Sequence, residues 1–106
     1  MKDKIFYTYI LLTERNTLYC GYTDDIENRF KKHCLGIGAK YTRANKPKKI
    51  VFLTSFNDKS QAIKEERRIK KLTRQQKDEL IYNFVLTKNT LFDFAQTINL
   101  KIKNIT

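Results

Sequence analysis

The stretch LYCGYTDDIENRFKKH, residues 18–33, predicts the junction between a strand and a helix. Residues 17–22 have the composition of a strand, and the acid at position 24 or 25 can cap a helix that runs to about residue 34. One row of this helix is apolar at a spacing of four residues, as expected of a side that packs against a core: Ile26, Phe30 and Cys34. The stretch therefore predicts a helix laid on a sheet.

Two polar side chains lie on the neighbouring side of this helix, at the rim of the expected core. Arg29 and His33, the only histidine, are four residues apart and so project together. The planar guanidinium of Arg29 can bind phosphate oxygens, and His33 can exchange a proton near neutral pH. The alternative is an ordinary solvated helix face.

The rest of the chain predicts a small sheet flanked by helices. Residues 5–12 have the pattern of a buried strand, and the polar turn at 13–16 joins them to residues 17–22 as an antiparallel hairpin. A basic loop at 36–49, after a helix end at Gly36 and Gly38, leads to a third strand at 50–56. Further helices are predicted from Asp58 or Ser60 to about Leu72, from a Thr73–Gln76 capping box toward Val85, and over 90–98, with fraying after Leu100.

The expected fold class is α/β (α+β). Its order is β-β-α-β-α-α, with a three-stranded, mostly antiparallel sheet and a short C-terminal helix. A chain of 106 residues is expected to form one domain, over residues 1–85, with residues 86–106 as a helical extension and tail. The apolar run near the N-terminus is too short to span a membrane and lacks the flanks of a signal peptide.

The charge balance predicts a polyanionic partner. Lysine and arginine number 22 against 11 acidic residues, which gives a net charge of +11. Such an excess is typical of nucleic-acid-binding proteins, although a lysine-rich composition is the alternative. Two cysteines are too few for a disulfide framework, so a cytoplasmic setting is expected. A metal site from Cys20, His33 and Cys34 lacks a recognisable ligand spacing.

Glu66 breaks the pattern of its helix. At 100° per residue it falls about 40° from Ala62, in the middle of an apolar arc that also includes Ile63 and Ile69. A carboxylate on an inward face is costly unless it is paired or bound to a metal, and such departures are candidates for function. The alternative is a structural pair with a lysine or arginine. Glu65 is expected at the edge of the same arc.

Aromatic and basic residues supply the other candidates. Tyr7 and Tyr9 share one face of their strand, and Tyr19 is on the neighbouring strand, although tyrosine is common in strands without any function. The basic loop suits a phosphate backbone and an unstacked base, or is simply solvated. Its candidate nucleic-acid-binding residues are Lys40, Tyr41, Arg43, Lys46 and Lys48.

Taken together, these motifs resemble the GIY-YIG nuclease domain over residues 5 to 82. YTY (7–9) and YCG (19–21) stand at its two name-giving motifs, and AIKEERRIKKL (62–72) resembles the helix that carries its glutamate. Arg29 follows Gly21 by eight residues and His33 follows by four more, as in the family. GAKYTR (38–43) and KKIVFL (48–53) fit the small single-domain bacterial branch, which is similar to the nuclease subunit of a eukaryotic structure-specific resolvase.

The resemblance implies a role for each matching residue. Tyr9 and Tyr19 would be the motif tyrosines, Arg29 the phosphate-binding arginine and His33 the helix histidine. Glu66 would hold one divalent metal ion, Mg²⁺ or Mn²⁺. The chain departs from the pattern at Tyr7, where the family has glycine. Tyr9, Tyr19 or His33 would accept a proton from water. Arg29 and the net charge of +11 favour the phenolate form of a tyrosine base.

The expected function is therefore a metal-dependent endonuclease that cleaves DNA, or RNA, and selects branched, flapped or single-stranded structures in repair or recombination. The alternatives are a catalytically weak or inactive nucleic-acid-binding module on the same fold, and a plain interaction domain whose charge reflects composition. A protein partner or a homodimer is left open.

Overall fold

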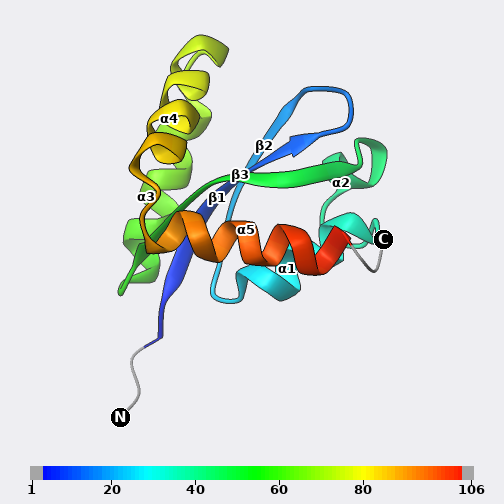
Figure 1. Cartoon of the computed structure of the whole chain (residues 1–106), viewed down its shortest axis with the longest axis horizontal. Coiled ribbons are helices and arrows are strands. Elements are labelled where there is room, and N and C mark those ends of the chain that lie inside the picture. Colours follow the sequence, from blue (N-terminus) through cyan, green and yellow to red (C-terminus); the bar gives the residue numbers. More distant parts are fainter. Residues whose placement is uncertain (1–3, 104–106) are drawn as a thin grey trace.

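A computed structural model of the chain describes residues 4–103. Its three strands are β1 (Phe6–Thr13), β2 (Leu18–Thr23) and β3 (Pro47–Phe56). Its helices are α1 (Ile26–Cys34), α2 (Lys40–Ala44), α3 (Lys59–Lys70), α4 (Arg74–Thr87) and α5 (Thr90–Lys103). The sheet has three antiparallel strands, which confirms the predicted fold class, and its order, which the sequence left open, is β2-β1-β3 (Figure 1).

Helices cover both faces of the sheet. Alternate residues of β1 point to opposite sides, so Thr8 donates a hydrogen bond to the Ala62 carbonyl of α3, whereas Tyr9 contacts His33 of α1. Helix α5 crosses the same face as α1, and the two helices are joined by an ion pair between Lys101 and Glu27 (Figure 1). The central strand β1 is buried from both sides.

Three boundaries differ from the prediction. The segment predicted as a basic loop at 36–49 contains the one-turn helix α2, and β3 begins at Pro47 instead of 50. Helix α5 does not stop at 98 or fray after Leu100 but continues to Lys103, because Ile98 and Ile102 are buried against the core. The tail predicted at residues 104–106 lies outside the described residues.

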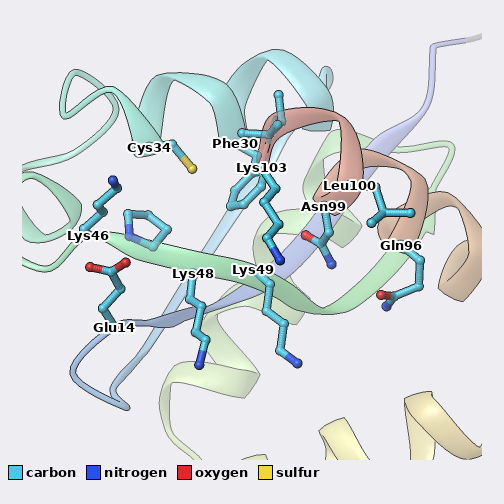
Figure 2. A pocket seen from close by; sticks show the side chains of 12 residues that line it. Glu14, Phe30, Cys34, Lys46, Lys48, Lys49, Gln96, Asn99, Leu100 and Lys103 are labelled. Atoms are coloured by element: carbon cyan, nitrogen blue, oxygen red, sulfur yellow. The ribbon is translucent and has the colours of Figure 1, made fainter. Parts of the chain in front are cut away.

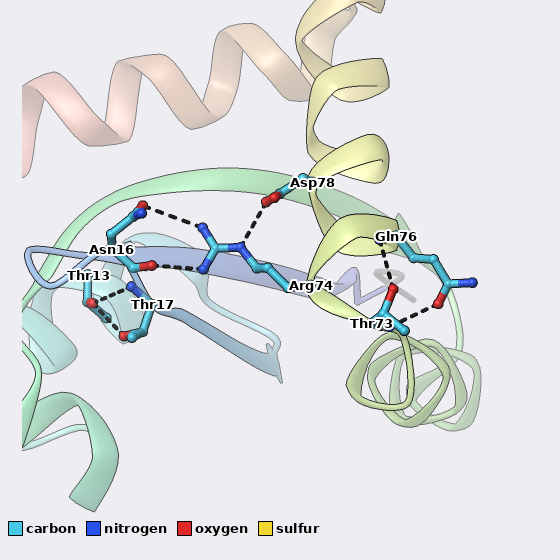
Figure 3. A network of polar contacts seen from close by, with 7 residues as sticks. All are labelled: Thr13, Asn16, Thr17, Thr73, Arg74, Gln76 and Asp78. Carbon is cyan, nitrogen blue, oxygen red and sulfur yellow. Dashed lines mark hydrogen bonds and ion pairs between the residues drawn. The ribbon is translucent and has the colours of Figure 1, made fainter.

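The β1–β2 turn is held by its own residues and by α4. Asn16 adopts the left-handed conformation (φ 64°), and the Thr13 amide donates to the Thr17 carbonyl at 2.9 Å. Arg74, in the first turn of α4, donates to the Asn16 carbonyl at 2.8 Å and to the Asp78 carboxylate at 2.9 Å (Figure 3). The hairpin that carries Tyr9 and Tyr19 is thereby fixed at its turn end.

Candidate active site

The two motif tyrosines lie on neighbouring strands under α1 and α2. Tyr9 is in the middle of β1 and is 1% exposed, whereas Tyr19, in β2, is half-buried. Their ring centroids are 6.4 Å apart. Tyr7, on the same face of β1, contacts Phe94 of α5 instead. The two strands therefore bring Tyr9 and Tyr19 together, whereas Tyr7 packs against α5.

His33 was predicted at the rim of the core, but it is fully buried, with an exposed fraction of 0%. Its Nε2 lies 2.8 Å from Tyr9 Oη, and its Nδ1 lies 2.7 Å from Thr42 Oγ1. The rings of Tyr9 and Tyr19 both contact the imidazole, with centroids at 5.8 and 5.1 Å. The solvated-face alternative is therefore wrong for this residue.

The hydrogen bond of Thr42 to a backbone carbonyl determines which atom donates in each of the other two hydrogen bonds. The Thr42 hydroxyl donates to the Ala39 carbonyl at 3.2 Å, so Oγ1 accepts from His33, which places the imidazole proton on Nδ1. Nε2 then carries the lone pair and accepts from the Tyr9 hydroxyl at 2.8 Å. Tyr9, His33 and Thr42 thus form a directed relay that runs from β1 to α2.

Two glycines make room for this relay. Gly21 is paired directly with Tyr9 across the strands, and a Cβ there would lie 2.5 Å from Tyr9 Oη. A Cβ on Gly38 would lie 2.6 Å from His33 Nδ1. Gly36, with φ 78°, ends α1 as predicted, but Gly38 serves the histidine and not the helix end.

Burial determines the protonation of both groups. Loss of solvent, helped by the charge of Arg29, lowers the pKa of His33 to about 4, so the imidazole is neutral at pH 7. Burial also raises the pKa of the Tyr9 phenol, and Arg29 opposes this shift only in part. The expectation that Arg29 and the net charge would favour a phenolate is thus wrong for Tyr9, because desolvation outweighs the nearby cation.

Helix α2 adds an aromatic wall. Tyr41 stacks on Tyr19 with ring centroids 5.9 Å apart and planes at 20°, and Tyr41 itself is 40% exposed. Thr42, the next residue, is buried and carries the relay. Tyr41 was among the predicted binding residues, whereas Thr42 was not, because the stretch was predicted as a loop and a threonine in a loop gives no signal of burial.

Arg29 lines an open pocket of about 350 Å³, to which Tyr9, His33 and Thr42 do not contribute. The positive charge of Arg29 lowers the pKa of His33 and opposes the rise in the pKa of Tyr9 that burial causes. The remaining lining residues come from the ends of β1 and β2 and from the start of α3: Phe6, Tyr22, Thr23, Asp24 and Lys59. A guanidinium in a concave site is suited to binding an anion.

Glu66 lies on the opposite side of β2. The Cys20 thiol, which alternates with Tyr19 along the strand, is 3.9 Å from the Glu66 carbonyl. The Glu66 carboxylate is 16% exposed and 3.4 Å from Lys70, whereas Glu65 is 21% exposed and bound to Arg68. Since β2 is an edge strand, the carboxylate and Tyr19 lie on the two sides of that edge.

The predicted nucleic-acid-binding residues are divided between two places. Lys40, Tyr41 and Arg43 lie on α2, exposed beside Tyr19. Lys46 and Lys48 line a second pocket, between β3 and α5. Among residues 4–103, no group of three or more His, Cys, Asp or Glu residues could hold a metal ion, and no helix is long and apolar enough to cross a membrane.

Comparison with known proteins assigns the family. Residues 5–79 match the family model described as the GIY-YIG catalytic domain. The chain belongs to the GIY-YIG family. This membership was predicted from the two motifs, the spacing of Arg29 and His33 and the helix that carries Glu66, and GIY-YIG domains are nuclease domains.

Several relatives share most of this GIY-YIG domain. The chain is 43% identical over 81 residues to a UPF0213 protein of Bacillus velezensis, and the matched stretch covers 76% of this chain and 82% of that protein. It is 48% identical over 75 residues to a UPF0213 protein of Clostridium perfringens, covering 71% and 81%. A solution NMR structure of a UPF0213 protein from Bacillus halodurans matches at 40% identity and a TM-score of 0.49, covering 74% of this chain and 83% of that one.

Proposed function

We propose that this chain is a metal-dependent endonuclease that hydrolyses phosphodiester bonds in DNA. The observation that carries the proposal is the relay from Tyr9 through His33 to Thr42, next to Arg29. A sheet-and-helix core has no structural need for a fully buried histidine with both nitrogens hydrogen-bonded, whereas a proton-transfer site does. Family membership supports the same reaction class.

Each residue of the site has a role in the proposed reaction. Arg29 binds a non-bridging oxygen of the scissile phosphate through its planar fork. The Tyr9 oxygen takes a proton from the attacking water as its own proton moves to Nε2 of His33. The bound phosphodiester supplies the negative charge that favours a protonated imidazole. Tyr19, which stacks on Tyr41 and contacts His33 at a tilt of 60°, forms the wall on which the substrate rests.

Glu66 is the residue that would hold a divalent cation. Glu65 is not available, since both its oxygens accept from Arg68 at 2.8 Å. A single carboxylate fits Mg²⁺, which keeps several waters and takes its other ligands from substrate phosphate, and Mn²⁺ can replace it. When bound, such an ion stabilises the leaving oxygen and the charge on phosphorus. The substrate would lie across the edge of β2, within reach of both faces.

The basic residues favour recognition of structure over sequence. Lys40 and Arg43 contact the backbone in this proposal, and Tyr41 offers a ring for an unstacked base. Flapped, branched or single-stranded DNA supplies such bases, so we propose a role in repair or recombination, in the cytoplasm. Binding of RNA through the same contacts is tested alongside.

A second candidate is a nucleic-acid-binding module with weak or absent turnover. The ion pair of Glu66 with Lys70 favours it, because a lysine 3.4 Å from the carboxylate competes with a metal ion. Lys70 is 53% exposed, however, and such pairs contribute only about 0–1 kcal/mol, so a cation can displace the ammonium.

The deciding experiment is cleavage of labelled branched, flapped, single-stranded and duplex DNA, and of a matched RNA, with Mg²⁺ or Mn²⁺. Glu66→Gln keeps the shape and removes the charge, and Glu65→Gln is the matched control on the same helix. We expect wild type and the control to cut and Glu66→Gln to bind without cutting. Cleavage by Glu66→Gln at the wild-type rate would contradict the role of Glu66. Binding without cleavage by every variant would establish the binding module instead.

A further inference from the structure

Helix α5 lies outside the residues that match the family model, which end at 79. It nevertheless packs on β3 in a defined register. The side-chain amide of Asn99 accepts from the Ile50 amide at 2.8 Å and donates to the Ile50 carbonyl at 3.0 Å. Together with the ion pair from Lys101 to Glu27 of α1, these contacts fix α5 against the sheet and α1.

Between α1, β3 and α5 this arrangement leaves a pocket of about 550 Å³ (Figure 2). Its apolar surface comes from residues of all three elements: Phe30, Cys34, Pro47, Leu100 and Ile102. Its polar lining is Glu14, Gln96, Asn99 and four lysines, Lys46, Lys48, Lys49 and Lys103. The volume is within the usual range for a site that holds a small organic group.

The pocket has a strong charge bias. The lining contains four lysines and one glutamate, and within residues 4–103 none of these lysines forms an ion pair. Lysine ammonium groups above hydrocarbon are complementary to a ligand with a phosphate at one end and a flat, weakly polar body at the other. An unpaired nucleotide has both parts.

Helix α1 separates this pocket from the tyrosine site. His33 points toward Tyr9, whereas Phe30 and Cys34 of the same helix line the lysine pocket. A nucleic acid with two segments that leave the cleavage point in different directions, such as a flap or a branch, can therefore occupy both places.

We propose that the pocket between α1, β3 and α5 binds an unpaired nucleotide in the second arm of a branched nucleic acid whose scissile strand lies at the tyrosine site. The inference rests on the proposed function for the identity of the substrate. It adds a second binding site, built by α5, and makes that site the source of selectivity for branched over plain DNA.

The test measures binding without cleavage. A fluorescent duplex with a single-stranded flap and the same duplex without the flap are titrated in EDTA over a range of salt concentrations. The variant is Lys49→Gln/Lys103→Gln. The control is Lys64→Gln/Lys71→Gln, which removes the same charge from exposed lysines on α3 and at its C-terminus, away from the pocket.

We expect the pocket variant to bind the flapped DNA roughly tenfold more weakly, with a salt slope flatter by about 1.4, since two contacts to a single strand are lost. Its affinity for the plain duplex should equal that of the control. Equal weakening of both DNAs, or no change for the flapped DNA, would overturn the proposal. Because the assay contains no metal, it measures binding even if the protein does not cleave DNA. Failure of the wild-type protein to bind either DNA would reject the nucleic-acid function as well.

Discussion

Tyr9 Oη lies 2.8 Å from Nε2 of His33, and both side chains are almost completely removed from solvent. The contact links the central strand to the last turn of α1, so the proposed site chemistry and the stability of the core depend on the same two groups. Any change in the protonation of His33 must therefore affect folding as well as activity.

The first prediction concerns stability against pH. Burial lowers the pKa of His33 to about 4 from an unfolded value near 6.5, so the unfolded chain binds a proton that the folded chain does not. This contribution to stability is present above the unfolded pKa and is lost as pH falls toward the folded pKa. We expect the free energy of unfolding to drop by about 2 kcal/mol between pH 7 and pH 5, measured by urea denaturation.

His33→Gln is the control for this experiment. His33 is the only histidine in the chain, and glutamine keeps an amide that can hydrogen-bond but does not titrate. The pH dependence between 5 and 7 should become nearly flat in the variant. A slope equal to that of wild type would show that other groups cause it.

The second prediction concerns Thr42, which we treat as a positioning residue. Thr42→Val keeps the volume but removes the acceptor for Nδ1–H, and an unsatisfied buried donor costs about 1–3 kcal/mol. The histidine can then change tautomer and lose its hold on Tyr9. We expect cleavage to fall roughly tenfold or more. The ¹⁵N chemical shifts of the imidazole should show the Nδ1–H tautomer in wild type and a mixture in the variant.

Thr42→Ser restores the hydroxyl without the methyl group. It should recover both the tautomer and most of the cleavage rate. If Thr42→Val and Thr42→Ser are equally impaired, packing of the methyl group is what matters and the relay is not.

The third prediction concerns Gly21. A methyl group there would overlap Tyr9 Oη and Cζ, at 2.5 and 2.8 Å from the new Cβ. Gly21→Ala should therefore destabilise the fold by about 1–3 kcal/mol, as measured in urea. In the Tyr9→Phe background the nearer of the two clashes is gone, so the same substitution should cost less. Additive effects in the double mutant would mean that strand geometry, and not the phenol, excludes a side chain at position 21.

The fourth prediction concerns the contact between α4 and the hairpin turn. Arg74→Met removes the donor to the Asn16 carbonyl and to Asp78 and should lower stability by about 1 kcal/mol. Arg67 is exposed on α3 and makes no such contact among the described residues, so Arg67→Met serves as the control. Equal melting temperatures for the two variants would contradict a stabilising role for this contact.

Much of the fold could be predicted because its signals are local. The cap of α4 is the predicted capping box of Thr73 and Gln76, and Asp25 caps α1 through the Asn28 amide. Strand composition and a short turn were enough for the hairpin, since such a connection permits only antiparallel pairing. The family could be recognised from the two motifs together with the spacing of Arg29 and His33 and the helix that carries Glu66.

The missed features depend on contacts between distant segments. The burial of His33 requires Thr42 and the space above Gly38, neither of which can be inferred from its own helix. Helix α2 is a single turn with one buried residue, too short for any apolar period. The helix wheel placed Glu66 toward the sheet but could not show that the sheet edge separates it from Tyr9 and His33.

The pairing of Asn99 with Ile50 has a consequence for association between molecules. An exposed edge strand offers unpaired amides and carbonyls to any other strand it meets, which is a route to aggregation. Here a side-chain amide imitates a neighbouring peptide group and occupies both hydrogen-bonding groups of Ile50 from a helix. The amide of one asparagine thus blocks the pairing of a further strand at Ile50, and α5 protects this part of the β3 edge in a small, strongly basic protein from contact with its own copies.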